Sequence, residues 1–596
     1  MKLRFYSKHC LFLFSASCLL FSIVFLHSCD KETSPVSSVP DEDVIITGPR
    51  GIVAHKDAIA IGEKMFSSSG VKTTKVTQGV YVIQGLGISN CIVIEGKEGI
   101  IVADTGDNVE EGRARLKAIR KITGKPIIAV IYSHWHYSNG TTPFISDGKN
   151  IPIIGHQKLD SNKTTAIGLL GPTVLRRAAF QMAMYLPKEG PDAAPFGSIE
   201  LTASEAGYIP PNRTVSNGEM LEIDGVRMKF FTEFRSDTDC SLIVHFPDLD
   251  MVYNNHSLPI FPNLYSLRGQ SFRDPKTWIE GIDLMLDIDP EHLVIVHGDP
   301  TSGKKAVRTR LVNYRDTMQF LYDQTIRGMN QGLTPDELVE FVKLPKHLTE
   351  DPFLKQVYIT EEAVVRQIYN GLVGWFNGDA VNIKQLPPAV ESQKIVEGFG
   401  GKDIVFSKTR QAFKNKEYQW SAKLATHLIN VDPEDKDAKL LKANALRRLG
   451  QLSVASNSRN WYLTQARVLE GKIDLSKPPG TFLTKSKVMK TPEYFIQTLK
   501  VMIDPEKSGD IESTLGVNFS DVGKKVSLHV RRGVAIYKDT YPKKGVNIEV
   551  TMTSETWARI IFKEIGFIRA LVTGDVKVTK GGIGDFKDFM AMFDKN

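Results

Sequence analysis

Two histidines one residue apart, His134 and His136, are the residues of this 596-residue chain best suited to metal chemistry. They directly follow Pro126–Tyr132, an apolar run rich in β-branched residues that predicts a buried strand. A turn at a strand end can direct both imidazoles at one point, and neutral imidazole is a preferred zinc ligand. Because a surface pair would have the same sequence, the interpretation depends on what else lies at strand ends.

Other polar turns also follow predicted strands. Asp104 ends the strand Ile100–Asp104 and is followed by Thr-Gly, and His297 ends a late strand. A turn between them carries Asp237 and Asp239. This order, an acidic strand end, a histidine cluster and then single ligands at later strand ends, resembles the metallo-β-lactamase fold. We expect Asp104 to hold its turn rather than to bind metal.

The elements around the histidines predict an α/β fold class. Val80–Gln84, Cys91–Glu95 and Ile100–Asp104 are short β-branched runs separated by Gly and Asn, which predicts a sheet. The next segment, Asn108–Ile122, has charged residues at helical spacing. Strands that alternate with helices in this way are typical of layered α/β domains.

Longer motifs narrow the resemblance to one family. Segments similar to those of the bacterial alkyl sulfatases are Arg176–Phe180, Leu186-Pro187, Pro262–Gly269, Tyr322–Thr325 and Gly374–Gly378. That family implies an αββα sandwich of the metallo-β-lactamase fold, an all-α dimerisation domain and a C-terminal α+β domain like sterol carrier protein. It also implies a zinc-dependent hydrolase that cleaves primary alkyl sulfates, such as dodecyl sulfate, to an alcohol and sulfate.

The resemblance and the changes of pattern along the chain predict five segments. They are a lipoprotein-type signal peptide (1–29), a linker (30–50), the metallo-β-lactamase-like domain (51–303), a helical, tetratricopeptide-like dimerisation domain (304–475) and the sterol-carrier-like domain (485–596). The apolar stripe of Glu361–Tyr369 would cover either a second copy of the chain or an ordinary core. Likewise, the apolar residues of Trp557–Phe567 would either line a lipid tunnel or fill a core.

The alkyl sulfatase site has two metal ions, held by a His-x-His-x-Asp-His motif, two acidic ligands and a late histidine. By resemblance, His134 and His136 take the first two ligand positions, and Asp237 takes an acidic one, with Asp239 as its neighbouring alternative. His297 takes the position of the late histidine. Two imidazoles, a carboxylate and a water are a usual set for catalytic zinc.

Three further positions of the family's site carry neutral side chains in this chain: Ser138 in place of Asp, Asn139 in place of His, and Asn255 in place of a bridging acid. Hydroxyl and amide oxygens are weak zinc ligands. We therefore expect one tightly bound zinc ion rather than two.

The resemblance also assigns the catalytic roles. His134, His136 and Asp237 would hold the zinc, whose bound water has a pKa near ~7 and supplies hydroxide for attack on the ester. Arg268 and Tyr265 lie in the motif that the family uses to hold the sulfate group. A planar guanidinium can contact two sulfate oxygens at once. The alternative for Arg268 is a buried structural arginine.

The replaced ligands leave a second class of function open. A pseudoenzyme with a degraded metal site could act as a dimeric, lipid-binding envelope protein. Ser138, Asn139 and Asn255 favour that interpretation, whereas the retained histidines and Arg268 favour the enzyme. A metallo-β-lactamase-fold hydrolase of another ester is a further alternative.

Charge and the N-terminus predict the partners and the location. The chain has 75 Lys and Arg against 68 Asp and Glu, and this net charge of +7 is spread thinly, so we expect no nucleic-acid partner. A basic start and the apolar run Leu11–Leu26 lead to Leu26–Cys29, which resembles a bacterial lipobox. We expect a lipid on Cys29 to anchor a homodimer to the bacterial envelope, periplasmic or surface-facing. The alternatives are an uncleaved anchor or an ordinary signal peptide.

Overall fold

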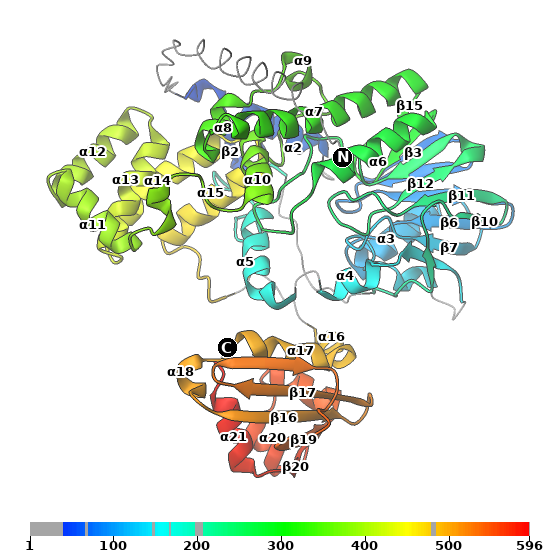
Figure 1. The fold of residues 1–596 in the computed structure, drawn as a ribbon. Helices are drawn as coiled ribbons and strands as arrows, with labels where there is room; N and C mark the ends of the chain where they lie inside the picture. The colour runs from blue at the N-terminus through cyan, green and yellow to red at the C-terminus, as the bar shows by residue number, and fades with distance from the viewer. Residues whose placement is uncertain are drawn as a thin grey trace, which may run out of the picture.

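The structure is a computed structural model that describes residues 40–65, 70–145, 150–165, 168–196, 207–477, 479 and 484–594. The predicted signal segment and Cys29 lie outside the described residues. A large body holds the sheets and most of the helices, and a smaller C-terminal domain lies against one side of it (Figure 1). None of the helices in the described part of the chain has the length and apolar character needed to span a membrane.

The first sheet has seven strands in the order β3-β4-β5-β6-β7-β8-β9. Strands β3 to β6 pair antiparallel, and β6 to β9 pair parallel. The central strands are apolar at nearly every position because both faces of this sheet are covered. The strand bounds are β3 Lys72–Thr77, β4 Val80–Gln84, β5 Cys91–Glu95, β6 Ile100–Ala103, β7 Ile127–Ile131, β8 Ile153–His156 and β9 Arg213–Val215.

The second sheet has six strands in the order β10-β11-β12-β13-β14-β15. Its pairs are antiparallel except for β13 with β14, which are parallel. The strand bounds are β10 Met220–Ile223, β11 Val226–Phe231, β12 Ile243–Phe246, β13 Met251–Asn254, β14 His292–Ile295 and β15 Thr301–Ser302.

The two sheets pack face to face and form a sandwich. Ile92 and Ile94 of β5 join Phe230 and Val244 of the second sheet in one core. The residues between them in the strand, such as Val93, point to the opposite face of the first sheet. They belong to a separate core with the helices that cover that face. The outer helices are α3 Val109–Ile119 and α4 Leu159–Thr165 beside the first sheet, and α6 Pro275–Ile288 and α7 Lys304–Asn330 over the second. The predicted αββα sandwich is confirmed.

Helix α7 joins the sandwich to the helical region. We expected residues from 304 onward to belong to the dimerisation domain. Val307 and Leu311 of α7 share one core with Trp278 of α6 and Ile295 of β14, and the same core includes Ile368 of α10. This helix therefore covers the second sheet and also packs with the helical region.

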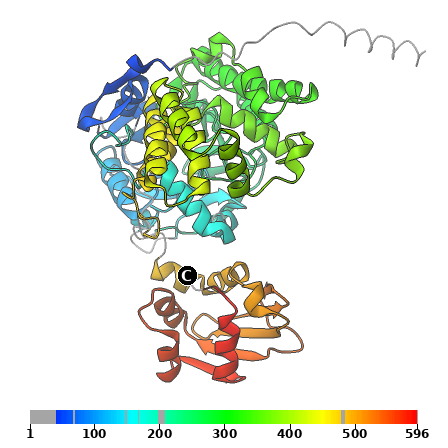
Figure 2. The ribbon, with the colours of Figure 1, turned by 90° about the vertical axis from the view of Figure 1, so that its left-hand side faces the viewer.

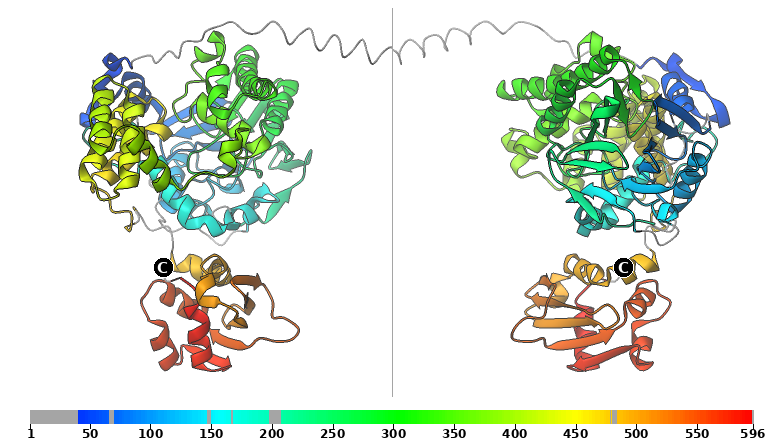
Figure 3. Two further views of the ribbon diagram at one scale, coloured as in Figure 1. Left: turned by 60° about the vertical axis from the view of Figure 1, so that its left-hand side comes forward. Right: turned by 90° about the vertical axis from the view of Figure 1, so that its right-hand side faces the viewer.

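The helical region follows as a stack of short helices on one side of the sandwich (Figure 3). Arg447 attaches this stack to the loop after α5, because its Nε lies 2.9 Å from Asp192 in that loop. Its Nη1 lies 2.7 Å from Glu470, which directly follows α15 in the stack. The bounds are α8 Pro335–Phe341, α9 Lys346–Thr349, α10 Glu361–Val373, α11 Pro388–Gly398, α12 Lys402–Lys414, α13 Tyr418–Val431, α14 Lys436–Leu452 and α15 Ser456–Leu469. The remaining elements of the large body are β1 Ile45–Thr47, β2 Val53–His55, α2 Lys56–Met65 and α5 Gly171–Gln181.

The C-terminal domain is built on a five-stranded sheet of order β18-β17-β16-β19-β20. Trp557 and Ile565 are buried in its core, and the apolar residues between them pack against that core. Helices α16 and α17 lie on the side that faces the large body (Figures 1 and 2). The bounds are α16 Lys485–Lys490, α17 Pro492–Thr498, α18 Pro505–Ser508, β16 Glu512–Phe519, β17 Lys524–Arg531, β18 Val534–Lys538, β19 Ile548–Met552, α19 Ser554–Ile561, α20 Phe567–Val572, β20 Val576–Lys580 and α21 Ile583–Ala591.

Candidate metal centre

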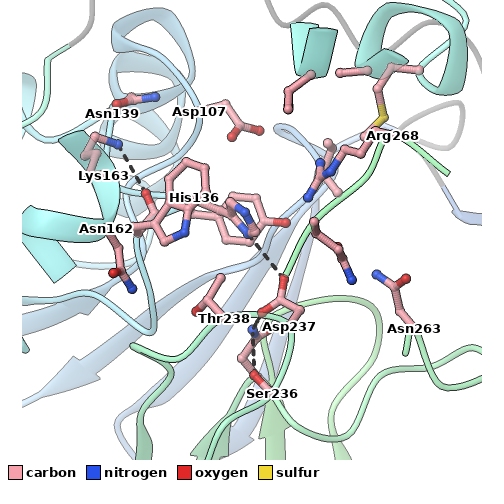
Figure 4. Close-up of a pocket in the computed structure, with 18 of the residues that line it drawn as sticks. Asp107, His136, Asn139, Asn162, Lys163, Ser236, Asp237, Thr238, Asn263 and Arg268 are labelled. Atoms are coloured by element: carbon pink, nitrogen blue, oxygen red, sulfur yellow. Dashed lines mark hydrogen bonds and ion pairs between the residues drawn. The ribbon is translucent and has the colours of Figure 1, made fainter. Parts of the chain in front are cut away.

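Three of the predicted ligands converge at one edge of the sandwich. His134 and His136 lie in the turn after β7, and Asp237 lies in the loop between β11 and β12 (Figure 4). The Nε2 of His134 is 2.8 Å from Nδ1 of His136, and that nitrogen is 3.3 Å from Oδ2 of Asp237. All three ligand atoms lie within 4.8 Å of one another.

The protonation states of these groups suit a divalent metal. Burial lowers the pKa of His134 well below 6.5 and also lowers that of His136, although Asp237 opposes both shifts. Burial acts to raise the pKa of Asp237, but His134, the hydrogen bond with His136 and the positive charge of Arg273 hold it well below 3.8. Two neutral imidazoles and an ionised carboxylate at the wall of a cavity fit one zinc ion with an open position.

A buried hydrogen-bond chain behind His134 fixes its orientation. The carboxylate of Asp104 accepts hydrogen bonds from the backbone N–H of Ser133 (2.9 Å), from its hydroxyl (2.7 Å) and from the hydroxyl of Tyr253 (2.5 Å). The Ser133 hydroxyl gives its proton to Asp104, so its oxygen accepts from Nδ1–H of His134 at 2.8 Å. This tautomer leaves the lone pair of Nε2 directed at Asp237 and His136. Burial raises the pKa of Asp104 to about 6.

The structure distinguishes Asp237 from its neighbour Asp239. Asp239 accepts from Asn162 Nδ2 at 2.5 Å and from Lys158 Nζ at 3.3 Å, so its carboxylate is engaged away from the two histidines. Asp237 instead accepts from Nδ2 of Asn255 at 2.6 Å, through Oδ1. Asn255 therefore holds the carboxylate so that Oδ2 faces the histidines.

His297 lines the same cavity but is engaged elsewhere. Its Nδ1–H donates to the carbonyl of Ile88 at 2.9 Å, so its Nε2 accepts from the hydroxyl of Tyr137 at 3.2 Å. Burial lowers the pKa of His297, so the ring is neutral. The structure does not bring this histidine into the group formed by His134, His136 and Asp237.

The neutral positions after the histidine pair also have partners. The hydroxyl of Ser138 donates to the carbonyl of Trp135 at 2.9 Å and accepts from Nζ of Lys163 at 3.0 Å. Asn139 lines the cavity beside Lys163 (Figure 4). Lys163 was not predicted, because its helix α4 is remote from the histidines in sequence.

Of the two predicted sulfate-binding residues, Arg268 lines the cavity and Tyr265 does not. Arg268 lines the cavity across His136 from Lys163 (Figure 4), and its backbone N–H donates to the side chain of Gln181 at 2.8 Å. Tyr265 is half-buried and is not among the residues that line this cavity. Sequence reasoning missed Arg273, a buried cation in the cavity wall whose charge acts on both histidines and on Asp237. Its only sequence signal was its place just beyond the Pro262–Gly269 motif.

The cavity is large, with a volume of about 2790 Å³, and three parts of the chain form its wall. The helical region contributes Phe353 and Tyr358, from the segment between α9 and α10. The sandwich contributes the metal centre and the arginines. Helices α16 and α17 of the C-terminal domain contribute Lys487 and Tyr494. An extended, partly apolar molecule with an anionic end would fit this distribution of groups.

Comparisons with known proteins agree with the fold and identify the family. Residues 84–254 match the metallo-β-lactamase superfamily, 334–472 the alkyl sulfatase dimerisation family and 486–596 the alkyl sulfatase C-terminal family. A linear primary-alkylsulfatase from Pseudomonas sp. (strain ATCC 19151) is 35% identical over 84% of this chain and 98% of its own length. An (R)-specific secondary-alkylsulfatase from Pseudomonas sp. is 27% identical over 87% of this chain and 80% of its own. The solved structure of a sec-alkylsulfatase from Pseudomonas sp. superposes with a TM-score of 0.78 at 24% identity, covering 95% of both chains.

The contact between Ser133 and His134 makes a prediction about metal affinity. Ser133→Ala removes the acceptor of the Nδ1 proton, so the His134 ring loses its fixed orientation. We expect zinc to bind about 10–100-fold more weakly, measured by competition with a chelating dye. Ser133→Thr keeps the hydroxyl and should keep most of the affinity. Zinc binding by Ser133→Ala that equals that of the unaltered protein would contradict this role.

Proposed function

The chain belongs to the alkyl sulfatase family, and we propose that it is a metal-dependent hydrolase that cleaves primary alkyl sulfates, such as dodecyl sulfate, to an alcohol and sulfate. The observation that carries the proposal is the convergence of His134, His136 and Asp237 on one point of a cavity that also contains Arg268. The relative at 35% identity is a linear primary-alkylsulfatase, which favours primary over secondary esters.

One zinc ion at His134, His136 and Asp237 would supply Lewis-acid polarisation and an activated water. The protein's own contribution is to present the ligands. Ser133 holds the tautomer of His134, and Asn255 holds the orientation of Asp237. The buried surroundings keep both imidazoles neutral, so that no proton competes with the ion near pH 7.

The cavity also suits both ends of the substrate. The guanidinium of Arg268 can donate hydrogen bonds to a sulfate group beside the metal centre, and the nearby charge of Arg273 adds to the positive field. An alkyl chain would find an apolar wall formed by Leu170, Val174, Met182, Ile260, Phe272 and Phe353. Each buried methylene contributes about 0.8 kcal/mol, so affinity should rise with chain length.

The metal centre gives a test of the function. We expect one zinc ion per chain by emission spectrometry, together with sulfate release from dodecyl sulfate. His134→Ala should remove both the ion and the hydrolysis. His297→Ala should lower activity with less effect on metal content, because its Nε2 is bound to Tyr137. His292→Ala, a histidine at the start of β14, is the matched control and should retain both.

Each other outcome of that experiment selects a different conclusion. Two zinc ions in the unaltered protein would contradict the mononuclear site. A chain that holds no metal and releases no sulfate would be the lipid-binding pseudoenzyme. A chain that holds metal but cleaves only another class of ester would keep the metal centre and lose the alkyl sulfate assignment.

We also propose that the protein is a homodimer, since residues 334–472 match the alkyl sulfatase dimerisation family. Large apolar side chains are exposed by 40% to 70% at the end of α10 and in the segment after it. This apolar face is formed by Leu372, Val373, Trp375, Val381 and Ile383. A contiguous exposed face of this kind is typical of a protein–protein interface.

The apolar face predicts a monomeric variant. Trp375→Ser combined with Ile383→Ser removes two of its most exposed side chains, and the fold should tolerate both changes because neither residue is buried. Light scattering at micromolar concentration should report a dimer for the unaltered protein and a monomer for this variant. Val572→Ser, which changes a residue 81% exposed in the C-terminal domain, should remain dimeric. An unaltered protein of monomer mass would contradict the proposal.

Finally, we propose that Cys29 carries a lipid that anchors the protein to the cell envelope. The support is the basic start, the apolar run and the Leu26–Cys29 motif. The Cys29→Ser protein should be lost from the membrane fraction. The control protein, Cys18→Ser, carries its change within the apolar run and should remain in that fraction. One acyl chain binds marginally, but several together hold firmly. A Cys29→Ser protein that stays in the membrane with unchanged gel mobility would contradict the anchor.

A further inference from the structure

Lys163 of α4 is a cation in the cavity wall whose direct partners are all neutral. Its Nζ donates to the hydroxyl of Ser138 at 3.0 Å and to the carbonyl of Trp135 at 3.2 Å. The same nitrogen lies 4.6 Å from the ring centroid of Tyr208. Within the described ranges, Lys163 forms no ion pair. The ammonium group is therefore held in place without an adjacent counter-charge.

A second cation approaches from the C-terminal domain. Lys487 belongs to α16, which lies opposite α4 across the boundary between the two parts of the chain (Figure 1). Its side chain lines the same cavity as Lys163 and keeps contact with solvent. No described acidic residue pairs with it. The protein atoms around Lys487 lower its pKa, as expected for a cation with no nearby anion.

The positive charge of Lys487 acts on Lys163. Burial and the positive charge of Lys487 lower the pKa of Lys163 to about 7, although Asp107 opposes the shift. Asp107 does not supply a full counter-charge, because burial and the neighbouring Glu111 raise its own pKa to about 7. Like charges in a partly desolvated cavity repel, and an anion between them would stabilise both.

We propose that Lys163 and Lys487 together bind a tetrahedral sulfur oxyanion, either the sulfate product or the sulfate head of the ester, at the boundary between the sandwich and the C-terminal domain. The identity of the anion rests on the proposed function, because hydrolysis would release sulfate into this cavity. Ser486 lines the cavity beside Lys487 and offers a hydroxyl donor. This site lies across His136 from Arg268, so it is separate from the position beside the metal centre (Figure 4).

The test is calorimetric titration of the full-length protein with sodium sulfate, in chloride at constant ionic strength. Lys487→Met and Lys163→Met should each weaken sulfate binding by about tenfold or more, since each removes a charged donor. The double variant should bind sulfate more weakly than either single variant, because each lysine contributes a charged donor to the same site. Lys500→Met, a lysine of the same domain that does not line the cavity, is the matched control and should bind like the unaltered protein.

A second titration distinguishes the two sources of the anion. Hexanesulfonate carries a similar head on a C–S bond that hydrolysis does not cleave. Competition with sulfate at the Lys487-dependent site would assign the site to the ester head as well as to the product. Binding of sulfate alone would assign it to the product.

Two results would overturn the proposal. One is sulfate binding by Lys487→Met that equals that of the unaltered protein, and the other is an equal loss in Lys500→Met. The outcome does not depend on turnover. A chain that binds sulfate through Lys487 but hydrolyses no alkyl sulfate would contradict the proposed function alone. A chain that hydrolyses alkyl sulfates but binds sulfate without Lys487 would contradict this site alone.

Discussion

The hydrogen bonds of the Asp104 carboxylate join the two sheets directly behind the histidine pair. Asp104 follows β6 of the first sheet, Tyr253 belongs to β13 of the second, and their side chains meet at 2.5 Å. A buried carboxylate is costly unless donors surround it, and this one has three. The same contacts hold Ser133, which holds His134. The ligand geometry therefore depends on how the two sheets pack.

The distribution of charge follows from that packing. The strand ends of both sheets bring Asp237 and two imidazoles to one edge, and loops and helices then surround this edge with cations. Arg268 and Arg273 come from the segment before α6, whereas Lys163 comes from α4. The helix that carries Lys163 is far in the sequence from the segment that carries the two arginines. Cations beside the metal centre, together with apolar side chains in the same cavity, are a consistent environment for an anionic amphiphile.

The sequence predicted the parts of the site that lie in short motifs. His134 and His136 were recognisable because a histidine pair follows an unbroken apolar strand. The strand runs predicted a layered α/β domain, and the αββα order came from the resemblance to the family. Lys163 and Lys487 were not predictable, since their roles depend on how α4 and α16 pack across the cavity. Tyr265 was expected at the sulfate from its motif alone, and a motif does not determine which of its side chains face a cavity.

The position of Lys163 also bears on how many ions the centre can hold. Its ammonium group lies 3.0 Å from the hydroxyl of Ser138, which is the first of the three neutral positions after His134 and His136. When protonated, this group repels a second cation, and the neutral hydroxyl of Ser138 is a weak ligand for it. His297 is meanwhile engaged by Tyr137. We therefore expect the retained ligands to hold one ion, with Arg268 and Lys163 in the cavity wall on either side of His136, an arrangement that suits the proposed sulfate ester.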